Sequence, residues 1–418
     1  MLGKIVVNLP GCLPFQERTP RSILKRFLFA TSLLMFVVVA FGLASTTSFP
    51  APDELEHISY AAYLQTTGRV LPEFQKQTTL DRSDFGQWDT RPNYIGHPSP
   101  YYLFIEQFLD RSLAPQQAIL LPRLASLGLL LVGLALAVQA GFRSFEQDEV
   151  ALAVFCIGLV FCPEILSIAR QVTNDALGIL GGALAYWGAM TQQRFGWFSS
   201  VGIVAGLTLA LWAKLNAGLE VGVFLSMLFA LQRPCSAQIL ASIAAGGLIG
   251  VLPYIIFIID YGAVVPVTAE AIWEVSHLNS LLEYFPIFFF NIGYTWGFGK
   301  TDLWSTFTTT GVLTTVAFWT MMAGAVLGVW PARQHSSDPR ATVAVAAVMT
   351  FLLVLPMHLW FASTRLGYSI PAASFRYYLP LWPALIHALA YAVSTAVKPS
   401  RRVSLAFLSA AALGLGWI

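Results

Sequence analysis

A short acidic stretch, DELEH at 53–57, follows the first long apolar run of the chain. Pro52 suits the first turn of a helix. In a helix that begins there, Asp53 and Glu54 lie four and three residues before His57, so these side chains share one face. Such a face at a membrane surface can deprotonate a hydroxyl group, bind a divalent cation, or do both. Helix capping explains one of the two acids but not both beside a histidine, so we predict a functional site here.

A second polar group, RQVTND from Arg170 to Asp175, lies between the third and fourth predicted spans. Asp175 opens an apolar helix, so an N-cap is the alternative reading. The connection faces the same side as the acidic stretch, and Arg170 could pair with Asp175 or hold a phosphate. His97 begins a third motif, HPSPYY, whose prolines fix an extended turn; a helix-start loop is its alternative. His57, Asp175 and His97 are therefore candidates for supporting residues or metal ligands.

Three basic residues, Lys214, Arg365 and Arg376, stand at the outer ends of predicted spans. Positive charge is disfavoured on that side of a membrane, so its presence there indicates an anionic partner. Snorkelling, or pairing with acidic residues, is the alternative. Arg376 lies in the sequence SFRYYLP, and a guanidinium can hold phosphate oxygens bidentately where lysine supplies a point charge.

The composition excludes an ordinary soluble protein. Hydrophobic residues make up 56% of the 418 residues and charged residues only 11%, with a mean hydropathy of +0.66. Soluble domains carry about a quarter charged residues, so the chain is an integral membrane protein. The net charge of +2 gives no sign of a nucleic-acid partner, and we predict none. The four cysteines are scattered, and Cys156 and Cys162 are interpreted as core thiols.

Apolar runs of spanning length predict an all-α polytopic membrane protein with about eleven transmembrane helices. The predicted spans are 27–47, 118–141, 150–168, 175–191, 198–215, 217–231, 237–259, 307–330, 341–363, 372–396 and 402–418. Five lysines and arginines precede the first span, which puts segment 1–26 in the cytoplasm. Alternation then puts the two long loops, 48–117 and 260–306, outside. A cleaved signal peptide is the alternative for the first run.

The first outer loop is predicted to carry amphipathic juxtamembrane helices. One runs from Asp53 to Thr67 and is closed by Gly68. A second lies within Ser99 to Leu113. Both outer loops are shorter than the commonest length of an independent domain, about 100–150 residues. We therefore expect residues 27–418 to form a single transmembrane domain.

In its layout the chain resembles the GT-C superfamily of integral membrane glycosyltransferases, which use polyprenyl-phosphate-linked sugars. That superfamily includes protein mannosyltransferases and bacterial aminoarabinose transferases. The resemblance rests on the order and sidedness of five short motifs. They are Asp53-Glu54 after the first span, HPSPYY from His97 before the second, Asn174-Asp175 before the fourth, Lys214 at the end of a span, and RYYLP from Arg376.

The resemblance implies transfer of a sugar, with inversion, from a lipid-linked donor to an acceptor on the extracytoplasmic face. Asp53, or less favourably Glu54, would be the general base. Glu54, His57 or Asp175 would orient it or ligate Mg²⁺ or Mn²⁺. The donor phosphate would be stabilised by three basic side chains, Lys214, Arg376 and Arg170.

The partners expected on this reading are the lipid-linked donor, membrane lipid and a glycan, lipid or protein acceptor. Short loops favour a bacterial plasma membrane. The main alternative is a transporter or flippase for a lipid-linked or anionic solute. The distinctive charges lie at the outer surface rather than near the middle of the membrane, which argues against it, as does the lack of a sequence repeat. A scaffold within a polysaccharide-export assembly is a further alternative, but it leaves the acidic stretch unexplained.

Overall fold

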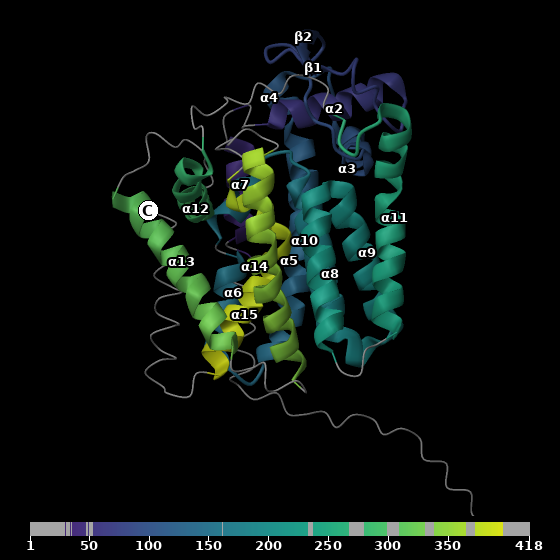
Figure 1. The fold of residues 1–418 in the computed structure, drawn as a ribbon. Helices are drawn as coiled ribbons and strands as arrows, with labels where there is room; N and C mark the ends of the chain where they lie inside the picture. Colours follow the sequence, from purple (N-terminus) through teal and green to yellow (C-terminus); the bar gives the residue numbers. More distant parts are fainter. Residues whose placement is uncertain are drawn as a thin grey trace, which may run out of the picture.

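The structure is a computed structural model, and its helices stand side by side in one bundle (Figure 1). It describes residues 53–160, 162–232, 237–266, 280–298, 309–330, 338–364 and 373–395, with 30, 34, 36–46 and 49. The helices of the bundle are α5 (Leu120–Phe145), α6 (Glu149–Val160), α7 (Pro163–Ala169), α8 (Asp175–Phe195), α9 (Trp197–Ala213), α10 (Leu215–Leu231), α11 (Ala237–Tyr261), α12 (Leu281–Phe298), α13 (Thr309–Val329), α14 (Pro339–Thr364) and α15 (Trp382–Thr395), with the 3₁₀ helix η3 (Phe375–Leu381) before α15.

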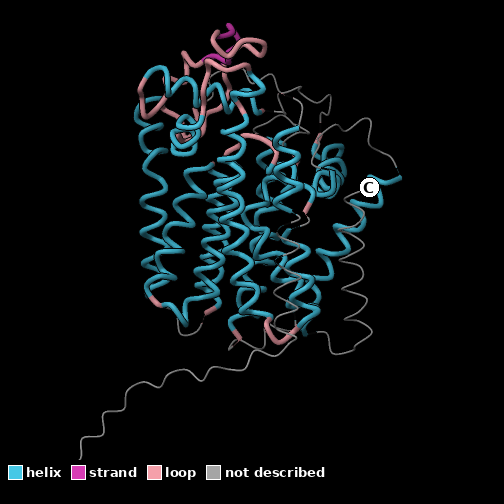
Figure 2. The backbone as a smooth tube through the Cα atoms, turned by 180° about the vertical axis from the view of Figure 1, so that it is seen from behind, coloured by secondary structure: helices cyan, strands magenta, loops and turns pink. Residues whose placement is uncertain are grey.

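Residues 53–118, most of the predicted first outer loop, form a cap over one end of this bundle, as the views from both sides show (Figures 1 and 2). Its elements are α2 (Glu54–Thr67), β1 (Thr78–Leu80), β2 (Trp88–Pro92), α3 (Pro100–Ile105), η1 (Glu106–Phe108) and α4 (Pro115–Ala118). Helices are thus present at both predicted positions, as α2 and α3, but α2 is buried on most of its sides rather than on one face. The antiparallel pair of β1 and β2 was not predicted, because strands of three and five residues are too short to give a periodic pattern.

Hydrogen bonds end α2 and join it to the rest of the cap. Gly68 ends the helix with φ +64°, a left-handed conformation that glycine adopts without steric cost, and its N–H donates to the carbonyl of Leu64 at 2.8 Å. Strand β1 is bonded to α2, because the N–H of Leu80 donates to Ser59 Oγ at 2.8 Å. The Asn93 side chain, just after β2, donates to the carbonyl of Glu56 at 2.8 Å. The bond from Asn93 to Glu56 holds the first turn of α2, where the acidic stretch lies.

Four of the described helices are long and apolar enough to cross a membrane: Pro115–Phe145, Ala237–Tyr261, Val312–Val329 and Pro339–Thr364. Helices α6 and α7, bent by 41° at their junction, together make a fifth candidate. Large apolar side chains on α11 are open on the outside, with Leu248 69% and Ile259 74% exposed. Apolar side chains so exposed suit contact with lipid.

The predicted count of about eleven spans is not confirmed. Helices α9 and α10 are apolar but have only 17 residues each, shorter than a typical span. The predicted segment 1–26 and the predicted span 402–418 lie outside the described residues.

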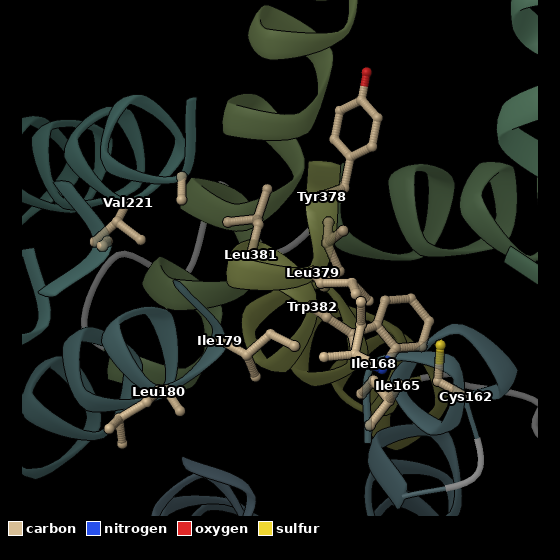
Figure 3. Close-up of a cluster of buried hydrophobic side chains, with 14 of the residues drawn as sticks. Cys162, Ile165, Ile168, Ile179, Leu180, Val221, Tyr378, Leu379, Leu381 and Trp382 are labelled. Atoms are coloured by element: carbon tan, nitrogen blue, oxygen red, sulfur yellow. The ribbon is translucent and has the colours of Figure 1, made fainter. Parts of the chain in front are cut away.

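The short helix η3 lies inside the bundle, in contact with α8, α10, α12 and α15. Figure 3 shows the apolar side chains around it. Tyr378, Leu379 and Leu381 of η3 and Trp382 of α15 lie among residues of α7, α8 and α10, including Ile168, Ile179 and Val221. The backbone of η3 lies close to α8 at Gly182. A Cβ on Gly182 would be only 2.6 Å from the carbonyl carbon of Pro380. Glycine is therefore needed at this position of α8.

We expect Gly182→Ala to destabilise the protein by about 2 kcal/mol, because the added methyl group overlaps the Pro380 carbonyl and forces η3 away from α8. Gly178→Ala is a matched control one helical turn earlier. A Cβ there would make ordinary contacts of 3.5–3.6 Å with Ala217, Ala213 and Pro380. Thermal unfolding in detergent should show a lower midpoint for Gly182→Ala alone. Equal midpoints for the two variants would contradict this packing of η3.

Candidate functional site

Four charged side chains from distant parts of the chain meet at the capped end of the bundle. Asp53 precedes α2, Asp175 opens α8, Lys214 separates α9 from α10, and Arg376 lies in η3. Arg376 joins the two acids: its Nη1 donates to Asp53 Oδ2 at 3.1 Å and its Nε donates to Asp175 Oδ2 at 2.5 Å. The Lys214 ammonium donates to the other oxygen of Asp175. The structure therefore brings these four predicted residues together in one cluster.

Asp53 has an unusual backbone conformation. Its φ of +62° and ψ of −6° are left-handed, and among the described residues it is the one non-glycine with positive φ. Aspartate tolerates this conformation better than most residues. Such a conformation costs of order 1 kcal/mol and persists where the surroundings impose it, often at functional sites. Here it lets Asp53 turn toward η3 while the next residue enters α2.

Lys214 and Arg376 are placed by breaks in helical structure. Lys214 is extended, with φ −168° and ψ 156°, between α9 and α10, and its side chain is only 4% exposed. Its ammonium lies 5.1 Å from the centre of the Tyr377 ring, a cation–π contact. Arg376 is in the first turn of η3, where its N–H donates to the side chain of Ser374 at 3.3 Å. Two cations therefore project into the cluster from separate elements.

The two aspartates differ in exposure. The side chain of Asp53 is 36% exposed, whereas that of Asp175 is 2% exposed and lies between two cations. The other oxygen of Asp53 accepts a hydrogen bond from the Tyr94 hydroxyl. Burial acts to raise the pKa of Asp53, but the Arg376 guanidinium and the Tyr94 hydroxyl more than offset it, so the pKa is lowered from 3.8. Asp53 is thus an accessible, ionised carboxylate at neutral pH.

Glu54 occupies a different environment from its neighbour. Its side chain is fully buried, and Arg123 donates to both its oxygens, Nε at 2.7 Å and Nη2 at 2.6 Å. The backbone N–H of Val172 donates to Oε1 at 2.9 Å. The two neighbouring carboxylates therefore differ in burial: Glu54 is 0% exposed and accepts three hydrogen bonds, whereas Asp53 is 36% exposed and accepts two.

The two predicted histidines lie near the cluster as neutral imidazoles. His57 Nδ1 is 3.0 Å from the Tyr102 hydroxyl. Burial lowers the pKa of His57 well below 6.5, and the charge of Arg376 lowers it further. Burial, with the charges of Lys214 and Arg376, lowers the pKa of His97 to about 3. Neither histidine adds positive charge to the site at neutral pH.

The metal site predicted at Asp53, Glu54 and His57 does not fit these side chains. Both Glu54 oxygens are taken by Arg123, and His57 faces the Tyr102 hydroxyl. In the part of the chain that the structure describes, no three histidine, cysteine, aspartate or glutamate side chains are grouped so that they could hold a metal ion. The charge in this cluster is balanced by lysine and arginine instead.

Arg170 does not form the predicted pair with Asp175, whose oxygens accept from Lys214 and Arg376. Arg170 caps the end of α7, and its buried Nε has no hydrogen-bond partner among the described residues. It therefore keeps donor capacity for a ligand. The third predicted basic residue at an outer helix end, Arg365, lies outside the described residues.

Sequence reasoning did not identify Tyr94 and Arg123. Tyr94 lies in a turn-rich stretch and gives no separate signal. Arg123 did give one, because it is the single charge within the predicted span 118–141. An ionisable residue in such a span is usually paired and functional.

Neither a protein family model nor a curated protein sequence matches the chain. Among solved structures, the crystal structure of ArnT from Cupriavidus metallidurans in the apo state is similar, with a TM-score of 0.54 at 16% sequence identity. The alignment covers 92% of this chain and 62% of ArnT, so the chain spans less than two thirds of the length of that protein. The likeness shows that the two proteins share a fold, in agreement with the predicted all-α bundle of a multi-pass membrane protein.

Proposed function

We propose that the protein is a membrane glycosyltransferase that moves a sugar from a polyprenyl-phosphate donor to an acceptor hydroxyl, with inversion at the sugar C1. Its structural neighbour ArnT is a GT-C aminoarabinose transferase, which supports the class of reaction. One observation carries the proposal: Arg376 bonds to both the partly exposed Asp53 and the buried Asp175, which also pairs with Lys214. A candidate base and two candidate phosphate-binding cations are thereby adjacent.

In the proposed step, Asp53 takes the proton of the acceptor hydroxyl as its oxygen attacks C1. The bond between C1 and the phosphate oxygen breaks, and its electron pair leaves with the phosphate. Arg376 and Lys214 stabilise the negative charge that develops there. Each can do so while bonded to Asp175, because lysine has three N–H donors and arginine five. Glu54 is less suited to be the base, because its side chain is fully buried and accepts three hydrogen bonds, whereas the Asp53 side chain is partly exposed.

The same proposal gives the place and partners of the reaction. The lipid tail of the donor lies among the helices, with its phosphate at the capped end of the bundle near Arg170. This end faces the extracytoplasmic side of a bacterial plasma membrane, and the N-terminus is cytoplasmic. The acceptor is a glycan, a lipid or a protein. No step is assigned to Mg²⁺ or Mn²⁺, because the Glu54 oxygens are engaged and His57 faces Tyr102.

The test is transfer by the purified protein in lipid nanodiscs. The protein is incubated with a panel of radiolabelled polyprenyl-phosphate sugars and acceptor extracts, with empty nanodiscs as the control. We expect label to move from one donor to the acceptor only when protein is present. Absence of transfer from every donor, alongside measurable donor binding, would overturn the proposal.

Two buried acids favour a second candidate, a transporter for an anionic or lipid-linked solute. Glu164 on α7 is 3% exposed and Glu220 on α10 is 1% exposed, and Oε2 of each has no hydrogen-bond partner among the described residues. Ionisable groups buried among spanning helices often mark a solute or proton pathway. Movement of labelled donor across a proteoliposome membrane without sugar transfer would establish transport instead.

A further inference from the structure

Glu54 and Arg123 form a buried ion pair that connects four separate segments. The Arg123 guanidinium donates to the two oxygens of the Glu54 carboxylate at 2.7 and 2.6 Å. The Glu54 side chain is 0% exposed and that of Arg123 is 3% exposed. Arg123 lies in the first turn of α5 and also donates from Nη1 to the carbonyl of Ala44 at 3.0 Å. The N–H of Val172, between α7 and α8, donates to Glu54 Oε1 at 2.9 Å. One carboxylate thus ties the start of α2 to α5 and to the α7–α8 connection.

The segments that meet at this pair are the ones that carry the two site aspartates. Glu54 directly follows Asp53, and Val172 lies three residues before Asp175. Both aspartates bond to Arg376, so their separation sets the position of that guanidinium. The left-handed backbone of Asp53 is held on one side by the Glu54 carboxylate and on the other by its own bonds to Tyr94 and Arg376.

Stability alone is a weak explanation for such a pair. Removing two charges from water costs free energy that their attraction barely repays, and apolar replacements of similar size are often as stable. A paired, bidentate geometry instead fixes direction and distance. What the pair supplies here is a fixed spacing between two backbone segments on either side of the site.

We propose that Glu54 and Arg123 are positioning residues that set the distance between Asp53 and Asp175 for the transfer reaction. The kinetic part of this inference rests on the proposed function. The structural part, a link from α2 to the α7–α8 connection, does not. Neither residue touches the sugar or the phosphate.

The experiment replaces both partners at once, because removing one would leave an unpaired buried charge. The double variant Glu54→Leu, Arg123→Met removes the ion pair, and its apolar side chains still occupy the buried volume. A second ion pair joins α2 to β2, with Glu56 and Arg91 3.1 Å apart and the Arg91 side chain 53% exposed, and it supplies the control Arg91→Gln. Amide hydrogen exchange and transfer kinetics are measured for each protein in nanodiscs.

In the double variant we expect amides 171–174 to exchange at least ten times faster, with α8 and α9 as protected as in the wild type, since loss of a local tie opens only its own segment. We expect kcat to fall about 100-fold, because small misplacement of reacting groups has effects of this size. The donor KM should change little, and Arg91→Gln should match the wild type in all respects. Unchanged exchange at 171–174, or a wild-type kcat, would overturn the inference.

Arg123→Lys keeps the inference testable if the double variant does not fold. It retains the buried positive charge but not the two-pronged contact, and we expect a smaller loss of kcat with faster exchange in the same segment. A wild-type kcat in this variant would overturn the positioning role. If the wild-type protein itself transfers no sugar, the proposed function fails, while the exchange at 171–174 still decides whether the link exists.

Discussion

Asp53→Asn is expected to lower kcat for sugar transfer by about 10³-fold, the usual contribution of a positioned general base. Asparagine has nearly the same shape, tolerates the left-handed backbone at this position, and can still accept the hydrogen bond from Tyr94. It cannot take a proton from the acceptor hydroxyl. The loss should therefore appear in kcat, with little change in the KM for the donor and no loss of folded protein, in single-turnover and steady-state transfer assays.

A matched control is Asp110→Asn, because Asp110 is an exposed aspartate of the same loop whose carboxylate accepts only local bonds from Ser112. This variant should transfer at the wild-type rate. Glu54→Gln completes the comparison. The assignment of Asp53 would be wrong if Asp53→Asn kept more than a tenth of the wild-type kcat while Glu54→Gln kept less than that. The general base would then be Glu54.

The convergence of Asp53, Asp175, Lys214 and Arg376 was predictable because the chain is so poor in charge. Ionisable residues at the ends of apolar helices need a partner or a ligand, and the alternation of loops put all four on one side of the membrane. The helix α2 and its end at Gly68 were also predictable from local pattern, and both are present. These inferences need only the order of residues along the chain.

The pairing of these charges was not predictable. Arg170 is near Asp175 in sequence, yet Asp175 bonds to Lys214 and Arg376, which are 39 and 201 residues away. Which cation reaches an acid depends on the rotation and depth of packed helices, and a single sequence does not contain that information. Helical periodicity likewise put Asp53, Glu54 and His57 on one face. The left-handed turn at Asp53 precedes the helix, so this periodicity does not apply to it.

The role of Arg123 had a sequence signal that was not used. A lone arginine within an apolar run indicates a buried partner, and Glu54 is that partner. The pair leaves Asp53 as the accessible carboxylate of the acidic stretch. The number of spans, in contrast, depends on helix length and tilt, which hydropathy alone does not fix.

Arg376→Gln is expected to lower kcat by about 10² to 10³-fold, because it removes the guanidinium that would stabilise the leaving phosphate. It should also raise the donor KM, since a bound phosphate loses a cation. Arg376→Lys should recover part of this loss, because an ammonium keeps the charge but not the two-pronged geometry that now joins Asp53 and Asp175. Arg340→Gln is the control, since Arg340 pairs with Asp338 at 2.9 Å and also donates to the carbonyl of Ser144, near the other end of α5.

The same substitution has a second, independent effect on the pH profile. In the wild type, burial acts to raise the pKa of Asp53 and the charge of Arg376 acts to lower it, with a net lowering from 3.8. A base must be unprotonated to act, so kcat/KM should stay level as pH falls and drop only below the usual aspartate pKa of 3.8. Without Arg376 the burial effect is unopposed by its charge, the pKa rises, and the acid limb moves to higher pH. An acid limb that stays in place in Arg376→Gln would mean that Asp53 is not the titrating base, even if kcat had fallen as expected.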